Sequence, residues 1–386
     1  MTEVLRNSTS SISPEGTGLE TLVARLARLA PETDYEGDFP EQGFAELAEA
    51  GLLAVTLPGG PLDFRTPQTR RLLTLLKRIG AGNLAVGRVY EGHLNALWLI
   101  HLYATPAQRA RWYADVTDRR CLFSVWNTQA DDGVRLHAGD DGTYRLEGTK
   151  TFCSGAGWVR RPLITGELYR DGVPQGWQMG IIPVGDGQTI PQDSRFWQPL
   201  GMRASASFRL DLTGITLRAD DLLGTPGQYY QPPHFVGGAI RFAAVQLGGA
   251  EAIFEATRQF LRELGRTDDP FQRARVAEMA LLLESGQHWL DAAGDKADAW
   301  LAAGTDPATI GAYANAVRTA IEEICLRVMP LAERCVGARG LLRPQPFERL
   351  HRDLTHYLRQ PAPDAALTDL GRYVLHASYP AHELWR

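Results

Sequence analysis

Tyr144-Arg-Leu-Glu-Gly-Thr-Lys-Thr-Phe-Cys-Ser-Gly-Ala156 is the stretch around which the rest of the chain can be organised. Residues 144–152 favour a β-strand, and they follow Gly139-Asp140-Asp141-Gly142, whose glycines can supply the positive φ of a tight hairpin turn. Further short β-rich runs lie on both sides, separated by Gly, Asp and Pro: residues 122–126, 162–166, 177–183 and 208–217. The centre of the chain, residues 119–226, is therefore predicted to be a β domain.

Helical spacing of apolar residues occupies both flanks of this β domain. On the N-terminal side it indicates helices over residues 19–30, around 44–52, and over 66–79 and 84–103; the last is apolar on nearly every face and should be buried. On the C-terminal side it indicates helices over residues 241–263, 272–301, 307–335 and 347–358. We therefore expect a mainly α chain with a central, β-barrel-like domain, an N-terminal helical domain (1–118) and a C-terminal four-helix bundle (227–386).

Composition narrows the classes of function. The chain of 386 residues is 44% hydrophobic and 22% charged, with a formal net charge of -5 and both signs interspersed. This charge offers no footprint for nucleic acid, and no apolar run approaches the roughly 20 residues of a membrane helix. Residues 1–16 are polar, unlike a signal peptide, and are expected to form a loose arm of a cytoplasmic protein.

The cysteines and histidines do not suggest a metal centre. The cysteines, Cys121, Cys153, Cys325 and Cys335, are scattered and form no Cys-x-x-Cys pair, so we expect reduced, mostly buried thiols. The nine histidines also lack the spacing that converges ligands on one helix face. We expect no metal.

The order of helices, β domain and helical bundle, together with four local stretches, resembles the acyl-CoA dehydrogenase superfamily over almost the whole chain. The most specific stretch is the quoted one, which is similar to the family's strand with Gly-x-Lys followed by Trp-Ile-Thr. In the family this segment packs on the flavin ring and its Thr hydrogen-bonds near N5. Here Phe152 can keep the aromatic contact and Ser154 the hydroxyl. An ordinary hairpin strand is the alternative.

The second stretch, Phe123-Ser-Val-Trp-Asn-Thr-Gln-Ala130, occupies the place of a family loop that covers one flavin face. The resemblance implies that Trp126, Asn127 and Thr128 contact the cofactor, although the family's Glu-Pro and following Gly-Ser are missing. A plain core role for Trp126 is equally compatible with the sequence.

Two further stretches complete the resemblance. Gly201-Met-Arg-Ala-Ser205 and the later Leu222-Leu-Gly224 resemble a structural segment of the family, in which Arg203 and Ser205 either close the domain seam or reach the cofactor. Val336-Gly-Ala-Arg-Gly340 and the helix start at Phe347 match the family's glycine turn, which approaches the flavin dinucleotide of a neighbouring subunit. The resemblance therefore implies cofactor binding by Gly337 and Gly340, and by an Arg and a Gln, for which Arg266 and Gln272 are the candidates. A surface role is the alternative for Arg266.

The catalytic carboxylate of the family is missing from both of its usual positions. One position falls near Pro361 and the other at Ile240, before Arg241. The remaining candidates for a base are Glu91, on the apolar stretch 84–103, and Asp364, near the lost base together with His356. Alternatively, Glu91 is a hydrogen-bonded structural carboxylate, Asp364 caps a helix over residues 365–377, and His93 is a satisfied core histidine.

Three functions follow from the resemblance. The first is an FAD-dependent oxidoreductase that oxidises the CH-CH bond of an acyl-CoA thioester, with hydride transfer to flavin N5. The second is a flavin-dependent monooxygenase of the same fold, which needs no carboxylate at that place. The third is a flavoprotein without turnover that has a binding role; DNA is a poor partner at this net charge. The resemblance also implies a homodimer or homotetramer, and the substrate and electron-transfer partner stay open.

Overall fold

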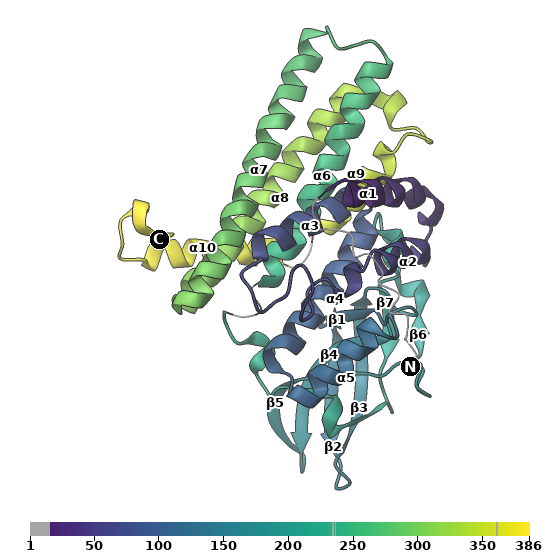
Figure 1. Cartoon of the computed structure of the whole chain (residues 1–386), viewed down its shortest axis with the longest axis vertical. Helices are drawn as coiled ribbons and strands as arrows, with labels where there is room; N and C mark the ends of the chain where they lie inside the picture. Colours follow the sequence, from purple (N-terminus) through teal and green to yellow (C-terminus); the bar gives the residue numbers. More distant parts are fainter. Residues whose placement is uncertain (1–15, 234, 236, 360–361) are drawn as a thin grey trace, which may run out of the picture.

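The computed structural model describes residues 16–386 except for 234, 236, 360 and 361, so nearly all of the expected N-terminal arm lies outside it. The N-terminal segment is helical, as predicted, with α1 (Thr17–Leu29), α2 (Glu41–Glu49), α3 (Thr69–Gly82), α4 (Leu84–Tyr103) and α5 (Pro106–Thr117). The C-terminal segment contains α6 (Gly237–Glu263), α7 (Pro270–Ala303), α8 (Pro307–Gly340), α9 (Phe347–Tyr357) and α10 (Pro363–His376). The long helices α6, α7 and α8 form a bundle that extends away from the β domain (Figure 1).

The central segment forms the predicted β domain. Its strands are β1 (Phe123–Trp126), β2 (Gln129–Ala138), β3 (Thr143–Cys153), β4 (Arg161–Arg170), β5 (Val173–Ile181), β6 (Gln192–Asp193), β7 (Phe208–Asp211), β8 (Thr216–Arg218) and β9 (Leu222–Leu223). Within the described residues they form one sheet in the order β6-β7-β3-β2-β4-β5-β9, with β1 parallel to β4 and β8 paired with β3. The turn between β2 and β3 confirms the predicted hairpin, with Gly142 at φ 76°. The expected domain boundaries fall in the connections α5–β1 and β9–α6.

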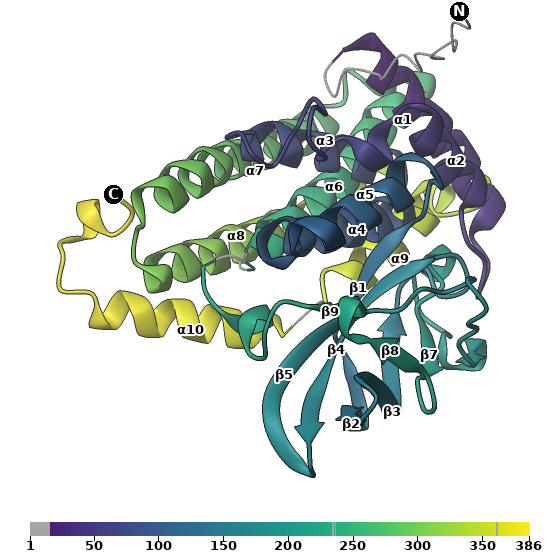
Figure 2. The same ribbon diagram turned by 60° about the horizontal axis from the view of Figure 1, so that its bottom comes forward.

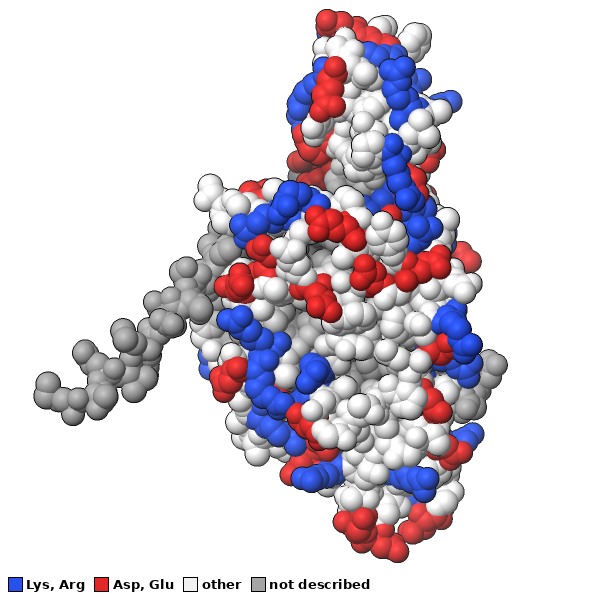
Figure 3. Space-filling model, turned by 90° about the vertical axis from the view of Figure 1, so that its right-hand side faces the viewer, with Lys and Arg blue, Asp and Glu red and all other residues white. Residues whose placement is uncertain are grey.

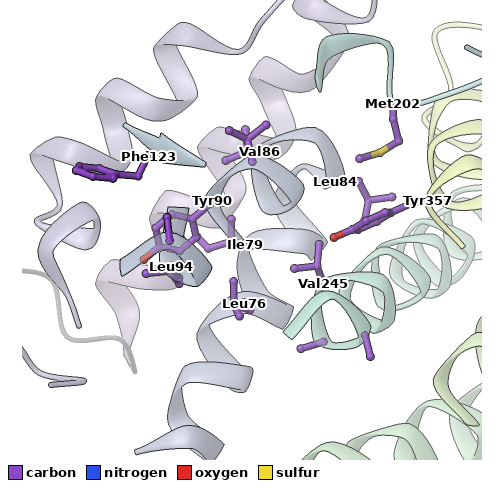
Figure 4. Close-up of a cluster of buried hydrophobic side chains, with 14 of the residues drawn as sticks. Leu76, Ile79, Leu84, Val86, Tyr90, Leu94, Phe123, Met202, Val245 and Tyr357 are labelled. Atoms are coloured by element: carbon purple, nitrogen blue, oxygen red, sulfur yellow. The ribbon is translucent and has the colours of Figure 1, made fainter. Parts of the chain in front are cut away.

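Helix α4 joins the sheet to the bundle. Its observed bounds are those predicted from its apolar sequence, and it lies between the β domain and α6 (Figure 2). Around it, buried side chains from α3, α4, β1, α6 and α9 meet in one cluster (Figure 4). Tyr90 anchors this cluster, because it is fully buried and its hydroxyl donates to the carbonyl of Leu52 over 2.7 Å. The four cysteines are buried and free, as expected.

Helices α3 and α6 approach each other through glycines. A Cβ atom added at Gly80 would lie 2.5 Å from the carbonyl oxygen of Val245, and one added at Gly248 would overlap the carbonyl oxygen of Lys77. These positions therefore exclude any side chain, and the backbones of the two helices touch. This contact fixes the N-terminal helices against the bundle.

The charges on the surface do not point to a particular class of binding partner. On the face shown in Figure 3, basic and acidic side chains alternate and neither sign dominates. In the described part of the chain, no helix combines the length and apolar character required to cross a bilayer.

Replacing Gly248 with alanine should destabilise the protein by on the order of 3 kcal/mol, because the added methyl group overlaps the backbone of α3. The matched control is Gly371→Ala in α10, where nothing lies within 4 Å of an added Cβ and alanine favours the helix. Thermal unfolding should show a midpoint several degrees lower for Gly248→Ala and an unchanged or higher one for Gly371→Ala. Equal midpoints would contradict the close helix contact.

Candidate functional site

The ends of β1 and β3 lie side by side and bring together the β-domain residues that the family resemblance singled out. Trp126 is buried, with 2% of its surface exposed, and its indole N–H donates to the carbonyl oxygen of Ser154 over 3.0 Å. Its hydrogen-bonding capacity is therefore used inside the protein. Thr128 is exposed, and its carbonyl accepts from the N–H of Thr151 over 3.2 Å.

Asn127, between them, is fixed by its neighbours. The hydroxyl of Thr165 donates to its side-chain oxygen over 2.6 Å, and the ammonium of Lys150 donates to its carbonyl oxygen over 3.1 Å. The amide nitrogen of Asn127 donates in turn to the hydroxyl of Tyr230 over 3.2 Å. The half-buried Asn127 is therefore held through both its main chain and its side chain at the end of β1.

Lys150 is an unusual residue for a protein interior. It is fully buried, and in addition to Asn127 it donates to the hydroxyl of Thr165 over 3.1 Å and lies 5.5 Å from the centre of the Trp177 ring. Among the described residues, no carboxylate forms an ion pair with it. Burial therefore lowers the pKa of Lys150 from its ordinary value of 10.5 to about 7.

Phe152 presents an aromatic surface at this place. The ring is 42% exposed, and its edge meets Phe196 and Trp197 at centroid distances of 5.3 and 6.1 Å. Trp197 in turn meets His356 of α9 at 5.3 Å. Phe152 has φ 54°, a conformation that is strained for a bulky side chain, where the register between β3 and β7 shifts. Such strain concentrates at functional sites.

Three buried serines support the segment behind Phe152. Ser154 and Ser207 share a hydrogen bond of 2.9 Å between their hydroxyl oxygens, and Ser205 and Ser207 share one of 2.8 Å. Nearby, the side chain of the half-buried Arg203 keeps its Nε without a hydrogen-bond partner. Ser205 and Arg203 thus lie beside the predicted cofactor segment and on the seam between the domains.

The other predicted cofactor residues lie at the far end of the helical bundle. Arg266 and Gln272 line a pocket of about 150 Å³ at the turn between α6 and α7, together with Arg258, Arg262 and Arg273. Gln272 is 4% exposed, and its side-chain oxygen has no partner. This turn and the β domain are at opposite ends of the molecule (Figure 1).

The glycine segment lies at this same end. Gly337 interrupts α8 with φ 59°, as the predicted turn requires, whereas Gly340 is buried with a neighbouring valine, Val336, so close that a Cβ could not be added. Cys335 lies just before them. Burial raises the pKa of its thiol, and the nearby charges of Arg275, Arg266 and Asp269 also act on it. The four predicted residues of this end therefore form one group in space, separate from the β-domain group.

Glu91 is tied into a buried polar cluster. It is 1% exposed; one carboxylate oxygen accepts from Arg88 over 2.7 Å, and the other accepts from Asn95. Asn95 in turn accepts from Arg241 over 3.0 Å. Burial raises the pKa of Glu91, against the opposing attraction of the Arg88 charge. Both oxygens are occupied, which favours a structural carboxylate over a free base.

The remaining candidates for a base are dispersed. Asp364 is exposed in the first turn of α10, and the expectation that it caps this helix is wrong, because the helix begins at Pro363 and no side chain caps it. Pro361 lies outside the described residues, and Ile240 is buried. His93 is a satisfied core histidine: Nε2 bonds to the carbonyl of Leu53 over 2.8 Å, Nδ1 accepts from an N–H over 3.1 Å, and burial lowers its pKa to about 4.

The residues present fit a flavin. Phe152, supported by the buried Trp197, offers aromatic contact, Asn127 and Ser154 lie at the ends of two strands with polar groups, and Arg203 keeps a buried N–H without a partner. The arginine pocket suits a phosphate-bearing part of the cofactor through its guanidinium groups, of which that of Arg266 is paired with Asp269 over 2.7 Å. The β-domain residues thus fit the ring of a flavin, and the arginine pocket fits its phosphate.

Comparison with known proteins decides the family. Residues 20–120 match the acyl-CoA dehydrogenase N-terminal domain, and residues 240–358 match the acyl-CoA dehydrogenase C-terminal domain. The chain belongs to the acyl-CoA dehydrogenase superfamily. This confirms the resemblance found in the sequence and the fold expected from it.

Within this superfamily the chain is similar to proteins of more than one activity. It is 25% identical to a dibenzothiophene monooxygenase of Rhodococcus erythropolis, over 93% of this chain and 92% of that protein. The FMN-bound dibenzothiophene monooxygenase of Paenibacillus sp. A11-2 shares the fold with a TM-score of 0.82 and 22% identity, over 96% of this chain and 100% of the other. Butyryl-CoA dehydrogenase of Megasphaera elsdenii shares it with a TM-score of 0.78 and 19% identity, over 97% and 100%.

Sequence reasoning missed the roles of Lys150 and Arg241. Lys150 stands in the quoted stretch, but the sequence does not reveal that its side chain points inward to Asn127. Arg241 was noted only as the neighbour of Ile240. The alternation of β3 could have placed Lys150 on the buried face with Leu146 and Gly148, which is the available signal.

Replacing Lys150 with methionine should change how stability depends on pH. Between pH 7 and 10.5 the unfolded chain keeps the Lys150 proton that the folded protein has released, so wild-type stability gains on the order of 1.4 kcal/mol per pH unit from this residue. Lys150→Met lacks this gain. The unfolding midpoint of the wild type should therefore rise relative to that of Lys150→Met between pH 7 and pH 10. Thr165→Val, which removes a neighbouring hydroxyl but no titrating group, should show a constant difference; a constant difference for Lys150→Met would contradict its burial as an amine.

Proposed function

We propose that this protein is a flavin-dependent monooxygenase of the acyl-CoA dehydrogenase superfamily. The observation that carries the proposal is the state of the carboxylates. Ile240 is buried at one of the two family positions for the base, and Glu91 has both oxygens engaged by Arg88 and Asn95. Acyl-CoA oxidation requires a base that can remove the α-proton, whereas oxygen transfer does not. Similarity to a dibenzothiophene monooxygenase over 93% of the chain supports the same choice.

The ring of the flavin would bind on the β domain, beside Phe152, Asn127 and Ser154. When bound and reduced, the flavin supplies the two electrons with which dioxygen is cleaved, one oxygen atom entering the substrate and the other leaving as water. The β-domain residues hold the ring. Lys150 and Thr165 fix Asn127, and the serine chain fixes Ser154, so that polar groups stand ready without reorganisation.

The aromatic side chains suit a planar, apolar substrate. Phe152 and Trp197 form a wall at right angles to each other, with an angle of 87° between their rings, and His356 lies beyond Trp197. Burial lowers the pKa of His356, so its imidazole is neutral at pH 7 and can accept or donate a proton at its ring nitrogens. The exposed ring of Phe152, backed by the buried Trp197, favours contact with an aromatic ring over a thioester chain.

The phosphate of the flavin would bind to a second copy of the chain. Arg266 and Gln272 are at the opposite end of the molecule from Phe152, so one copy cannot bring both to the same cofactor (Figure 1). A dimer or larger assembly can, by placing the α6–α7 turn of one copy against the β domain of another. The cofactor of this proposal is FMN or FAD, which share the proximal phosphate.

A phosphate-bearing flavin should bind more tightly than riboflavin by about tenfold or more, because the arginine pocket recognises charge. Arg266→Ala should remove most of this preference, while the matched variant Arg327→Ala, a surface arginine of α8 paired with Glu278, should keep it. Fluorescence titration of the apoprotein with riboflavin, FMN and FAD measures all three affinities. Equal affinity for riboflavin and FMN in the wild type would refute the phosphate site.

Anaerobic titration distinguishes the proposed reaction from acyl-CoA oxidation. Flavin-loaded protein is titrated with butyryl-CoA and octanoyl-CoA, and should keep its absorbance. The same protein is then reduced with dithionite and mixed with air in the presence of dibenzothiophene or indole, and product is sought by chromatography. Bleaching by a thioester would assign dehydrogenation and direct attention to Glu91. Failure to bind any flavin would rule out both enzymatic functions.

A further inference from the structure

A cavity of about 80 Å³ lies between the N-terminal helices and the bundle, away from the β domain. Its walls come from residues 62–72, α4, residue 233, α6, α7 and α8. Four aromatic side chains line it: Phe64, Trp98, Trp300 and Tyr313. Since one water needs about 10–15 Å³, the cavity has room for several waters or for one aromatic ring.

Arg241 lines this cavity and has no carboxylate as an ion-pair partner in the described chain. It is 5% exposed, and its guanidinium lies 5.4 Å from the centre of the Trp98 ring and 5.9 Å from that of Phe64. One terminal nitrogen donates to Asn95 over 3.0 Å, but Nε is buried without a partner. Part of its hydrogen-bonding capacity is therefore unused beside an open space.

The carboxylates near Arg241 are already engaged. Glu91 pairs with Arg88, and in the described chain no carboxylate lies within ion-pair distance of Arg241. Asp298 also lines the cavity, but its oxygens accept from the N–H of Thr69 over 3.0 Å and from the Thr69 hydroxyl over 2.5 Å. These hydrogen bonds do not neutralise the charge of Asp298, but in the described chain neither it nor any other carboxylate forms an ion pair with Arg241.

A buried charge without a counterion is costly. Burial lowers the pKa of Arg241 to about 10, against the weaker attraction of the Glu91 charge. An anion in the cavity would relieve this cost, because it could accept from the guanidinium where water is excluded. The flanking aromatic faces would hold a ring beside that anion.

We propose that this cavity is a binding site for a small aromatic anion, such as a single-ring carboxylate, with the anionic group on Arg241 and the ring among Phe64, Trp98 and Trp300. No β-domain residue lines the cavity. Ile240, at one of the family positions for the base, lines the cavity wall, but the site goes beyond the proposed oxygen chemistry, since binding needs neither a flavin ring nor turnover.

Benzoate is the probe, and benzamide is its uncharged counterpart of the same shape. Isothermal titration of flavin-loaded wild-type protein should give saturable binding of benzoate, at least about tenfold tighter than that of benzamide, because only benzoate compensates the guanidinium. Loading with flavin keeps the probes out of the flavin site. This comparison uses no variant and so does not depend on any variant folding.

Arg241→Met tests the residue. It keeps the length of the side chain and removes the charge, so benzoate should lose about tenfold or more in affinity while benzamide stays within about twofold. The matched control is Arg318→Met, another buried arginine, stacked at 5.0 Å on Phe242 and outside the cavity lining, which should leave benzoate binding unchanged. Circular dichroism confirms that each variant is folded.

Three results would overturn the inference: no saturable benzoate binding to the wild type, equal affinity for benzoate and benzamide, or unchanged benzoate affinity in folded Arg241→Met. Because the titration measures binding alone, its outcome is separate from that of the thioester titration. Benzoate binding together with flavin bleaching by a thioester would contradict only the proposed monooxygenase reaction. Absence of benzoate binding together with absence of bleaching would contradict only the anion site.

Discussion

The contact between α3 and α6 is the constraint on which the other features of this protein depend. Gly80 and Gly248 allow the two backbones to touch, and no other residue type fits there. This closeness seats the N-terminal helices directly on the bundle, and α4, which follows α3 after Asn83, is thereby enclosed between bundle and sheet. The enclosure of α4 keeps water from Glu91 and Arg241. The electrostatic interactions of their charges are therefore stronger than they would be in water.

A second constraint acts on the β side. Lys150 is a buried amine whose only described polar partners are neutral oxygens, and it holds Asn127 at the end of β1. The strained backbone at Phe152 lies two residues further along the same strand. A rigid strand with an internal donor can maintain such strain, which costs of order 1–3 kcal/mol. The polar and aromatic groups that we assign to the flavin ring are therefore set by the interior of the sheet rather than by a loop.

Long periodic elements could be predicted from the sequence, and local chemistry only in part. The apolar run of α4 gave its bounds, and Gly142 marked the hairpin before β3, because both signals are local. The sequence predicts that α3 begins at residue 66, whereas it begins at Thr69, because the apolar periodicity does not mark the first turn. The alternative that Asp364 caps a helix over residues 365–377 is wrong, because the helix begins at Pro363 and no side chain caps it. The cavity at Arg241 joins residues 62–72 to α7 and α8, and no spacing along the chain shows such a meeting.

The predicted cofactor residues illustrate the same limit. The family resemblance selected Phe152 and Ser154 as well as Arg266 and Gln272 and implied a neighbouring subunit at the glycine turn, but not the distance between these pairs in one chain, which the structure places at opposite ends. Their separation follows from the length of α6 and α7, which carry the arginine pocket away from the sheet. In the assembly that we propose, the flavin site is complete only between two copies, and spacing along the chain does not reveal how far apart its two halves lie in one copy.

In the proposed reaction an oxygen atom from dioxygen enters the substrate. Reduced, flavin-loaded protein is mixed with ¹⁸O₂ and dibenzothiophene or indole in unlabelled water, and the product is analysed by mass spectrometry. A monooxygenase product should carry one ¹⁸O atom. A product whose oxygen comes from water, or reoxidation of the flavin by ¹⁸O₂ that never labels these or any other aromatic substrate, would contradict it.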